Sequence, residues 1–463
     1  MDAVRALRDV SPTPFWLDDP GRPEATSALV GNVRCDLLVV GGGYSGLWTA
    51  LIAKERDPSC DVVLVEGEEI GWAASGRNGG FCESSLTHGL GNGFERWPDE
   101  LARLERLGET NLQEMEDAIG RHGIDCDWER TGALDVATEP HHLAELRELA
   151  ELSARYGAER TLLDADETRA EISSPTFLGA LRDDSTAMLN PARLAWGLKR
   201  ACLGLGVRVH ERTRAVSVEE SGAGISVRTP YGSVLAGRVA LATNAFPSLL
   251  KRHRLYTVPV YDYALMTQPL TAGQLASVGW RSRRGFSDAA NQFHYVRLSA
   301  DNRILWGGYD TLYHFRGKVR AEHDQRPETF ATLARHFFRT FPQLEDLRFT
   351  HAWGGAIDTC TRFSAFFDTT HRGRVAYAAG YTGLGVGATR FGAEVMLDLL
   401  AGASTERTRL EMVRRKPLPF PPEPARWAGI QATRWSLARA DRQAGRRNLW
   451  LKGLDRLGLG FGS

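Results

Sequence analysis

Three glycine-rich stretches are the parts of this sequence best suited to hold a ligand against the backbone. They cover residues 41–46, 75–80 and 380–387 and read GGGYSG, SGRNGG and GYTGLGVG. Glycine has no Cβ, so it permits tight turns and lets the backbone approach another group closely. The first stretch has the spacing G-x-G-x-x-G, which is typical of a turn that binds a dinucleotide.

The segments around residues 41–46 have the order strand, turn, helix, strand. Residues 33–40 and 61–65 read as apolar strands, and residues 47–56 between them read as a helix. In such a unit the phosphates lie at the helix N-terminus, where free N–H groups and the helix dipole favour anions. Glu66 follows Gly46 by twenty residues, in the place of an acid that binds a ribose. The pattern favours dinucleotide binding over an ordinary glycine-rich turn.

The other two glycine-rich stretches favour FAD over a nicotinamide cofactor. A nicotinamide enzyme usually needs only the first stretch, whereas three stretches indicate a cofactor held along its length. Residues 41–46 would then take the pyrophosphate, and residues 75–80 would pass beside the isoalloxazine. Residues 380–387 precede a predicted helix and would aim its N-terminus at the flavin O2 region, where negative charge gathers on reduction.

Length, charge and cysteine content limit the class of protein. A chain of 463 residues is too long for one compact core, so we expect two domains. The formal net charge of +0 gives no general preference for nucleic acid. No window approaches the roughly 18 apolar residues of a membrane span, and residues 1–10 lack the apolar region of a signal peptide. Six scattered cysteines without a C-x-x-C pair indicate reduced thiols, a cytoplasmic location and no metal site.

The order of the predicted elements indicates an α/β fold. It is a Rossmann-like FAD-binding domain with an inserted substrate domain built on a mixed antiparallel sheet. We assign residues 30–90, 165–245 and 350–410 to the FAD-binding domain, and residues 91–164 and 246–349 to the substrate domain. Residues 411–463 form a basic, helical C-terminal tail. We expect this tail to dock onto its own protein, with a membrane surface or a partner as the alternative.

Several segments resemble the D-amino-acid-oxidase-like family of FAD oxidoreductases. The resemblance is strongest to the γ-glutamylputrescine oxidase and sarcosine/glycine oxidase branch, and it runs from about residue 14 to residue 402. The segments that carry it read CDLLVVGGGYSGLWTA, ASGRNGGF, RVALATNAF with VPVYDYALMTQPL after it, RLSADNRILWGGYD and GYTGLGVGATRFG. The motif SGRNGG at residues 75–80 is the most specific of them.

The resemblance implies oxidation of a C–N bond in a primary or secondary amine or an amino acid. The unprotonated amine loses the equivalent of hydride to flavin N5, the imine hydrolyses, and O2 or another acceptor reoxidises the flavin. The resemblance assigns FAD contacts to Gly41, Gly43, Tyr44, Ser45, Gly46, Glu66, Ser75, Gly76, Arg77, Asn78, Gly79, Gly80, Val216, Gly383, Leu384, Gly385 and Val386.

Aromatic and basic residues on the predicted antiparallel strands are candidates for the substrate pocket. Aromatic side chains on neighbouring strands could hold an ammonium by cation–π contact, although packing in a sheet core is the commoner use of such residues. The candidates are Tyr261, Tyr263, His294, Tyr295, Arg297 and Trp353.

Two departures from the family pattern concern reoxidation and cofactor attachment. Relatives of the sarcosine oxidase kind place a lysine near flavin N5, and at the matching position this chain has Trp306. A dehydrogenase that uses an acceptor other than O2 therefore stays open. Those relatives also attach the flavin to a cysteine, and Cys360 falls several residues late for that role. We therefore expect FAD to be bound without a covalent bond.

Two other classes of function stay open. A flavin monooxygenase would carry a Gly-Asp motif before the last helix, and this chain has Gly380-Tyr381 there. Such an enzyme needs NAD(P)H to reduce its flavin, which an amine oxidase does not. A flavoprotein without catalytic activity would turn over no amine at all.

Overall fold

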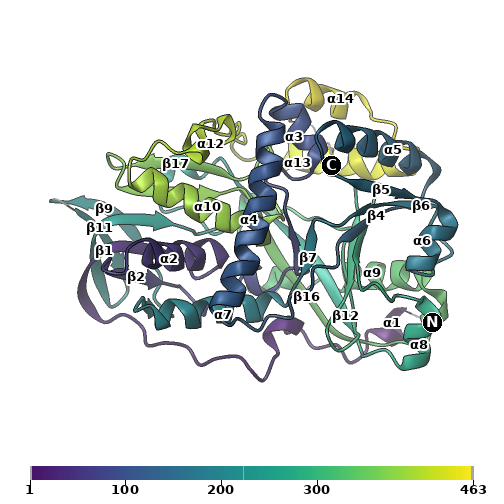
Figure 1. Ribbon diagram of the computed structural model, residues 1–463, viewed down its shortest axis with the longest axis horizontal. Coiled ribbons are helices and arrows are strands. Elements are labelled where there is room, and N and C mark those ends of the chain that lie inside the picture. The colour runs from purple at the N-terminus through teal and green to yellow at the C-terminus, as the bar shows by residue number, and fades with distance from the viewer. Residues whose placement is uncertain (1–2, 223, 460–463) are drawn as a thin grey trace.

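The computed structural model describes residues 3–222 and 224–459, which form two sheets side by side (Figure 1). The first sheet has the strand order β17 (Phe366–Thr370), β18 (Val375–Ala379), β11 (Gly232–Leu241), β1 (Gly31–Val40), β2 (Val62–Val65) and β8 (Arg208–His210). β10 (Gly224–Thr229) pairs with β11, and β9 (Ser217–Ser221) pairs with β10. β18, β11, β1, β2 and β8 run parallel, as the predicted dinucleotide-binding unit requires.

Helices α2 (Tyr44–Arg56), α4 (Leu101–Arg121), α7 (Pro191–Gly204) and α10 (Gly385–Leu400) pack together over one face of the first sheet. α2 and α10 begin three residues earlier than their predicted starts at residues 47 and 388. The last residues of the first and third glycine-rich stretches are therefore already helical. α7 begins where the sequence predicts, because the Asn190 side chain accepts a hydrogen bond from the Arg193 N–H (3.2 Å) and Pro191 follows it.

The second sheet is mainly antiparallel. Its strand order is β16 (Phe349–Thr359), β12 (Val258–Thr267), β15 (Ile304–Gly308), β14 (His294–Leu298), β13 (Gly285–Asp288), β4 (Ala133–Ala137), β6 (Gly179–Asp183) and β5 (Arg160–Leu163). A short pair, β3 (Phe81–Glu83) and β7 (Thr186–Met188), forms a third sheet. β6 and β16 lie in ranges predicted for the FAD-binding domain, but both pair in the second sheet, so the predicted ranges need correction at these strands. The other domain boundaries stay a prediction.

Each strand of the second sheet divides its side chains between two faces. On β12, Tyr261, Tyr263 and Leu265 are buried in a core with α9 (Pro327–Thr340), whereas Ala264 and Met266 join the core of the first sheet. This alternation has a period of two, so neighbouring residues on β12 have different surroundings. β4, β6, β13 and β17 are short strands of four or five residues, which show few repeats of this pattern.

The remaining helices are mostly shorter. They are α1 (Ala3–Ala6), α3 (Leu90–Arg96), α5 (Pro140–Arg155), α6 (Ala165–Glu171), α8 (Ala272–Val278), α11 (Glu406–Arg409), α12 (Glu411–Arg414), α13 (Ala425–Arg442) and α14 (Leu449–Arg456). Among them, α5 packs against β4, β5 and β6. None of the helices within residues 3–222 and 224–459 has both the length and the apolar composition of a membrane span.

The C-terminal tail docks onto loops of the second sheet through α13. The Asp441 carboxylate accepts hydrogen bonds from the Asn291 N–H (2.9 Å) and the Gln292 N–H (3.1 Å). Arg434, which interrupts the apolar stripe of the helix, pairs with Asp310 at 2.5 Å. The tail therefore contacts its own protein, and its last four residues, 460–463, lie outside the described part of the chain.

Removal of the Asp441 carboxylate should release α13. Charge-assisted bonds to backbone N–H groups are among the stronger anchors of a surface helix, so we expect Asp441→Ala to speed chymotrypsin cleavage at Trp427 and Trp435 about tenfold. Arg442→Ala is the matched control, because the Arg442 Nε donates to the Ala438 carbonyl of the same helix (3.0 Å). Equal cleavage rates for Asp441→Ala and the wild type would show that this carboxylate does not anchor the tail.

Candidate functional site

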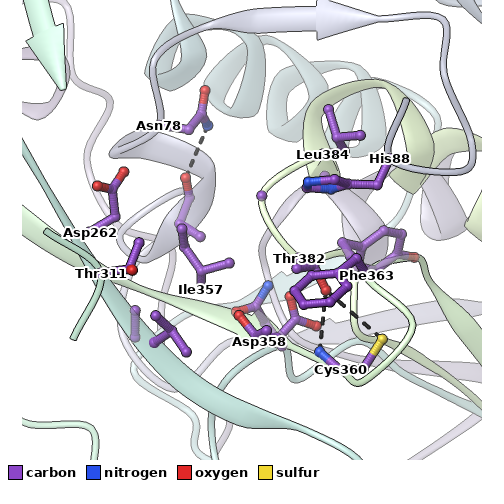
Figure 2. A pocket seen from close by; sticks show the side chains of 18 of the residues that line it. Asn78, His88, Asp262, Thr311, Ile357, Asp358, Cys360, Phe363, Thr382 and Leu384 are labelled. Atoms are coloured by element: carbon purple, nitrogen blue, oxygen red, sulfur yellow. Dashed lines mark hydrogen bonds between the residues drawn. The ribbon is translucent and has the colours of Figure 1, made fainter. Parts of the chain in front are cut away.

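A cavity of about 1400 Å³ brings the three glycine-rich stretches together. Its walls include residues 41–45, 66, 75, 77–79, 216 and 383–386 from the first part of the fold, and Asp262, Tyr295 and Trp353 from the second sheet. Figure 2 shows Asp262 and Thr311 on one side of this pocket and His88 and Leu384 on the other. The cavity is thus a shared space between elements that lie far apart in the sequence.

The first stretch makes the tight turn that the sequence predicts. Gly41 has a φ of +117°, and a Cβ there would collide with the Ala242 carbonyl oxygen. A Cβ on Gly46 would collide with the Gly41 carbonyl oxygen, so Gly46 allows α2 to pack against the turn. Gly46 itself does not line the cavity among the described residues, whereas residues 41–45 do.

Glu66 lies at the end of β2, beside this turn. Its carboxylate accepts hydrogen bonds from the Gly42 N–H (2.5 Å) and the Glu68 N–H (2.9 Å), and burial raises its pKa. The side chain is therefore held against the first turn and forms part of the cavity wall.

The loop of residues 75–80 is fixed by its own polar groups. The Ser75 hydroxyl accepts a hydrogen bond from the Tyr44 N–H (2.9 Å), which joins the loop to the start of α2. The Asn78 amide oxygen accepts from the Gly80 N–H (2.8 Å), and its nitrogen donates to the Ala74 carbonyl (2.9 Å). Gly76 and Gly80 are packed against protein atoms and are absent from the described cavity wall.

The third stretch closes the opposite end of the pocket. Asp358 at the end of β16 accepts a hydrogen bond from the Gly380 N–H (2.5 Å), and burial raises its pKa to about 7. Burial also lowers the pKa of His88 to about 4, so this imidazole is neutral at pH 7. Asp358 and His88 line the pocket, but the sequence gives neither residue as a candidate. Isolated His and Asp residues without a recognisable spacing offered no signal.

Three of the six substrate candidates, Tyr263, Tyr295 and Trp353, line this pocket, and the last two lie on the face that meets the first sheet. Tyr295 lies beside the 75–80 loop, and a Cβ on Gly79 would come within 2.9 Å of its ring. The Trp353 indole donates a hydrogen bond to the Arg77 carbonyl (2.9 Å). Both residues line the cavity and belong to the face of the second sheet that meets the first sheet.

The four candidates other than Tyr295 and Trp353 are used in packing. The Tyr261 and Tyr263 rings lie in the core with α9, and the Tyr263 hydroxyl donates to the His323 carbonyl (2.9 Å). His294 lies on the same side, between Asp288 (2.6 Å) and His336 (3.0 Å). Strand alternation explains these placements. Tyr263 still contributes to the cavity wall, but Tyr261 and His294 do not.

Arg297 is buried below the 75–80 loop and away from the described cavity wall. Its guanidinium donates to the Leu189 carbonyl (2.6 Å) and the Gly80 carbonyl (3.1 Å). Burial lowers the pKa of Arg297 to about 10, which leaves it charged at pH 7. The placement makes Arg297 a support for the loop.

Asp262 lies between Tyr261 and Tyr263 on β12, and its side chain faces the pocket. Its Oδ2 accepts a hydrogen bond from the Tyr295 hydroxyl (2.8 Å), and burial raises its pKa to about 6. The alternation of β12, with Ala264 and Met266 on the same face, is the signal that could have identified it.

Trp306 and Cys360 occupy the positions of the two departures from the family pattern. Trp306 lies in the α9 core, and the adjacent residue Gly307 faces the Tyr295 ring instead. No described residue of the cavity wall is a lysine. The Cys360 thiol is buried and contacts the Ser364 carbonyl (3.2 Å). Within the described chain no group of three His, Cys, Asp or Glu residues could hold a metal ion.

The residues present fit FAD. A long cavity connects the turn of residues 41–46 to the 75–80 loop and to the N-terminus of α10. A Cβ on Gly41 would meet the Ala242 carbonyl oxygen and one on Gly43 the Ser75 hydroxyl, so both glycines keep the turn compact, and Gly43 provides no side-chain cap to α2. The helix N-terminus is therefore available to an anionic group such as a pyrophosphate.

Comparisons with known proteins agree with this geometry. The chain is 33% identical over 384 residues to a gamma-glutamylputrescine oxidoreductase of Escherichia coli (strain K12), covering 80% of this chain and 84% of the relative. It is 27% identical over 402 residues to a probable oxidoreductase OrdL of Haemophilus influenzae, covering 84% and 88%. The fold matches a crystal structure of glycine oxidase from Geobacillus kaustophilus with a TM-score of 0.67 and 19% identity, covering 81% of this chain and 96% of that one. The family model for FAD dependent oxidoreductases matches residues 36–399, so this chain belongs to that family and is an FAD-dependent oxidoreductase.

Proposed function

We propose that this enzyme oxidises a C–N bond of a primary or secondary amine or an amino acid. The observation that carries the proposal is the position of Asp262 and Tyr295, whose hydrogen-bonded pair faces the pocket beside the 75–80 loop. A carboxylate and an aromatic ring are groups that bind a protonated or neutral amine. The name of one relative, a gamma-glutamylputrescine oxidoreductase, supports the same class of substrate.

The protein would contribute orientation, while bound FAD accepts the hydride equivalent from the carbon next to the nitrogen. Asp262 would hold the amine, and Tyr295 would fix the carboxylate through its hydroxyl. Trp353, held by the Arg77 carbonyl, would form an apolar side of the pocket and exclude water from the reacting carbon. The imine product would hydrolyse to a carbonyl compound.

Two features of the proposal concern the electron acceptor and the cellular compartment. The acceptor is O2 or another oxidant, and the absence of a lysine from the described cavity wall favours an acceptor other than O2. The six cysteines are free thiols in the structure, which supports a reducing compartment such as the cytoplasm. The partners are thus a small amine or amino acid and an electron acceptor.

An anaerobic screen of amines and amino acids tests the proposal. We expect loss of the flavin absorbance near its visible maximum with at least one amine, and slow recovery on admission of air compared with recovery by an artificial acceptor. Bleaching by NADPH in place of every amine would support a flavin monooxygenase. A flavin that no amine, amino acid or nicotinamide reduces would contradict the proposal and favour a flavoprotein without catalytic activity.

The proposed cofactor contacts predict that Glu66→Arg loses FAD. The substitution replaces an acceptor at the predicted ribose position by a cation and breaks the bonds from Gly42 and Glu68. We expect at least about a hundredfold weaker FAD binding, measured as the flavin content after dialysis. Glu66→Gln preserves the shape and serves as the control. If folded Glu66→Arg retains a full flavin spectrum, the assigned role of Glu66 is wrong.

We further predict that FAD is bound without a covalent bond. The Cys360 thiol is buried against the Ser364 and Gly380 carbonyls, and burial raises its pKa, so the reactive thiolate is disfavoured. After acid precipitation and centrifugation, the yellow colour should remain in the supernatant. Yellow colour in the pellet that disappears in Cys360→Ala would show covalent attachment at this residue.

A further inference from the structure

The face of the second sheet that lines the cavity carries acidic residues at the two ends of a row of side chains. Along the register of the strands, Ala264, Gly307, Tyr295, Ser287 and Asp135 lie opposite one another on successive strands. Asp262 is two residues from Ala264 on the same face of β12, so it lies at one end of this row. Four strand spacings separate β12 from β4, which places Ala264 and Asp135 about 19 Å apart, and Asp262 lies two residues further along β12.

Asp262 has an oxygen without a protein partner. Its Oδ2 accepts the Tyr295 hydroxyl, but the buried Oδ1 has no hydrogen-bond partner among the described residues. A buried carboxylate oxygen without a partner is costly, and the cost falls when a cationic ligand donates to it. The Asp262 carboxylate, which lines the cavity, lies at the near end of the row.

The far end of the row has a second group of carboxylates, Glu83, Asp135 and Asp183, around Arg160. Asp183 pairs with Arg160 at 2.8 Å and accepts a hydrogen bond from the Ser185 N–H at 2.8 Å. Within the described chain, no hydrogen bond or ion pair involves the carboxylates of Glu83 and Asp135. Burial and the neighbouring acids raise the pKa of Glu83 to about 7 and that of Asp135 to about 6. All four residues line the same cavity as Asp262.

The arginines of the cavity wall do not offset these charges. Arg77, Arg160 and Arg434 pair with Asp324 (2.5 Å), Asp183 (2.8 Å) and Asp310 (2.5 Å). These three guanidinium groups are thus already matched by carboxylates, and the unmatched groups at both ends of the row are acidic. Arg214 and Arg254 also line the cavity, but they lie in the segments that follow β8 and precede β12, outside the row. The α-carboxylate of an amino acid would be repelled there, whereas a second ammonium group would be attracted.

We propose that the substrate is a polyamine that spans this row, with its reacting end beside Asp262 and a distal ammonium between Glu83 and Asp135. The inference rests on the proposed oxidation of a C–N bond and narrows its substrate class. Asp262 determines binding of the reacting end, and Glu83 and Asp135 determine the preference for a long, doubly charged molecule. The two acidic ends require ammonium groups at both ends of the ligand, and the uncharged side chains of Tyr295 and Ser287 lie between them.

Calorimetry on the full-length holoenzyme, reduced with dithionite under nitrogen, tests the site without turnover. The ligands are putrescine, spermidine, spermine, monoacetylated spermine and glycine. We expect spermine to bind most tightly, and glycine and putrescine most weakly. Glu83→Gln and Asp135→Asn should each weaken spermine binding about tenfold and leave binding of monoacetylated spermine nearly unchanged, because each removes one charge from the distal end. Asp262→Asn should weaken the binding of both spermine and monoacetylated spermine.

Asp166→Asn is the matched control, since Asp166 is an exposed carboxylate on α6 that pairs only with Arg169 among the ion pairs of the described chain. Because Glu83 and Asp135 have no protein partner to lose, their neutral variants should fold, which circular dichroism checks. Spermine binding unchanged in both variants, or glycine binding tighter than spermine, would overturn the polyamine inference. Flavin bleaching by amino acids but not by polyamines would do the same and leave the proposed C–N oxidation intact. The absence of bleaching by any amine would contradict the proposed reaction, whereas calorimetry would still report on the acidic site.

Discussion

The arrangement of the site depends on one buried cation, Arg297. Its guanidinium donates to the Gly80 and Leu189 carbonyls, and it lies 5.6 Å from the centroid of the Trp16 ring. Trp16 in turn donates to the Asn78 carbonyl (3.0 Å). Arg297 on β14 thereby joins the second sheet to the 75–80 loop, to the segment before α7 and to the N-terminal segment that contains Trp16. Because a buried guanidinium must satisfy its donors, these four segments can meet in only one arrangement.

This arrangement brings two walls of different chemistry together. The first wall is made of glycine turns and helix N-termini, which favour a long anionic cofactor. The second wall is the face of a sheet that carries Asp262, Tyr295 and Trp353. A ligand between them is held by backbone on one side and by side chains on the other. Changes in the sheet can therefore alter the substrate while the cofactor site remains the same.

Burial of the acidic groups in this row lowers the stability of the folded protein, which indicates that they have a function. Burial raises the pKa values of Glu83, Asp135 and Asp262, which means that their charged forms are less stable in the folded protein than in water. Such groups lower the stability of the empty site as the pH rises through their pKa values, because the unfolded chain releases the same protons at lower pH. A cationic ligand removes this penalty, as the polyamine inference requires.

The sequence alone determined the cofactor half of this protein. Glycine spacing, the acid at residue 66 and the strand–helix–strand order are local patterns, and the turn at Gly41 and Gly46 has the close contacts that they predict. The resemblance in the glycine-rich segments also indicated the family before the fold was known. The substrate half needed the tertiary structure. On β12, a shift of one residue separates Tyr261 and Tyr263, which pack under α9, from Asp262, which faces the pocket. Which face of a strand meets a cavity depends on the layers packed on both sides, and Glu83 and Asp135 come together only because β3 and β4, distant in the chain, line the same cavity.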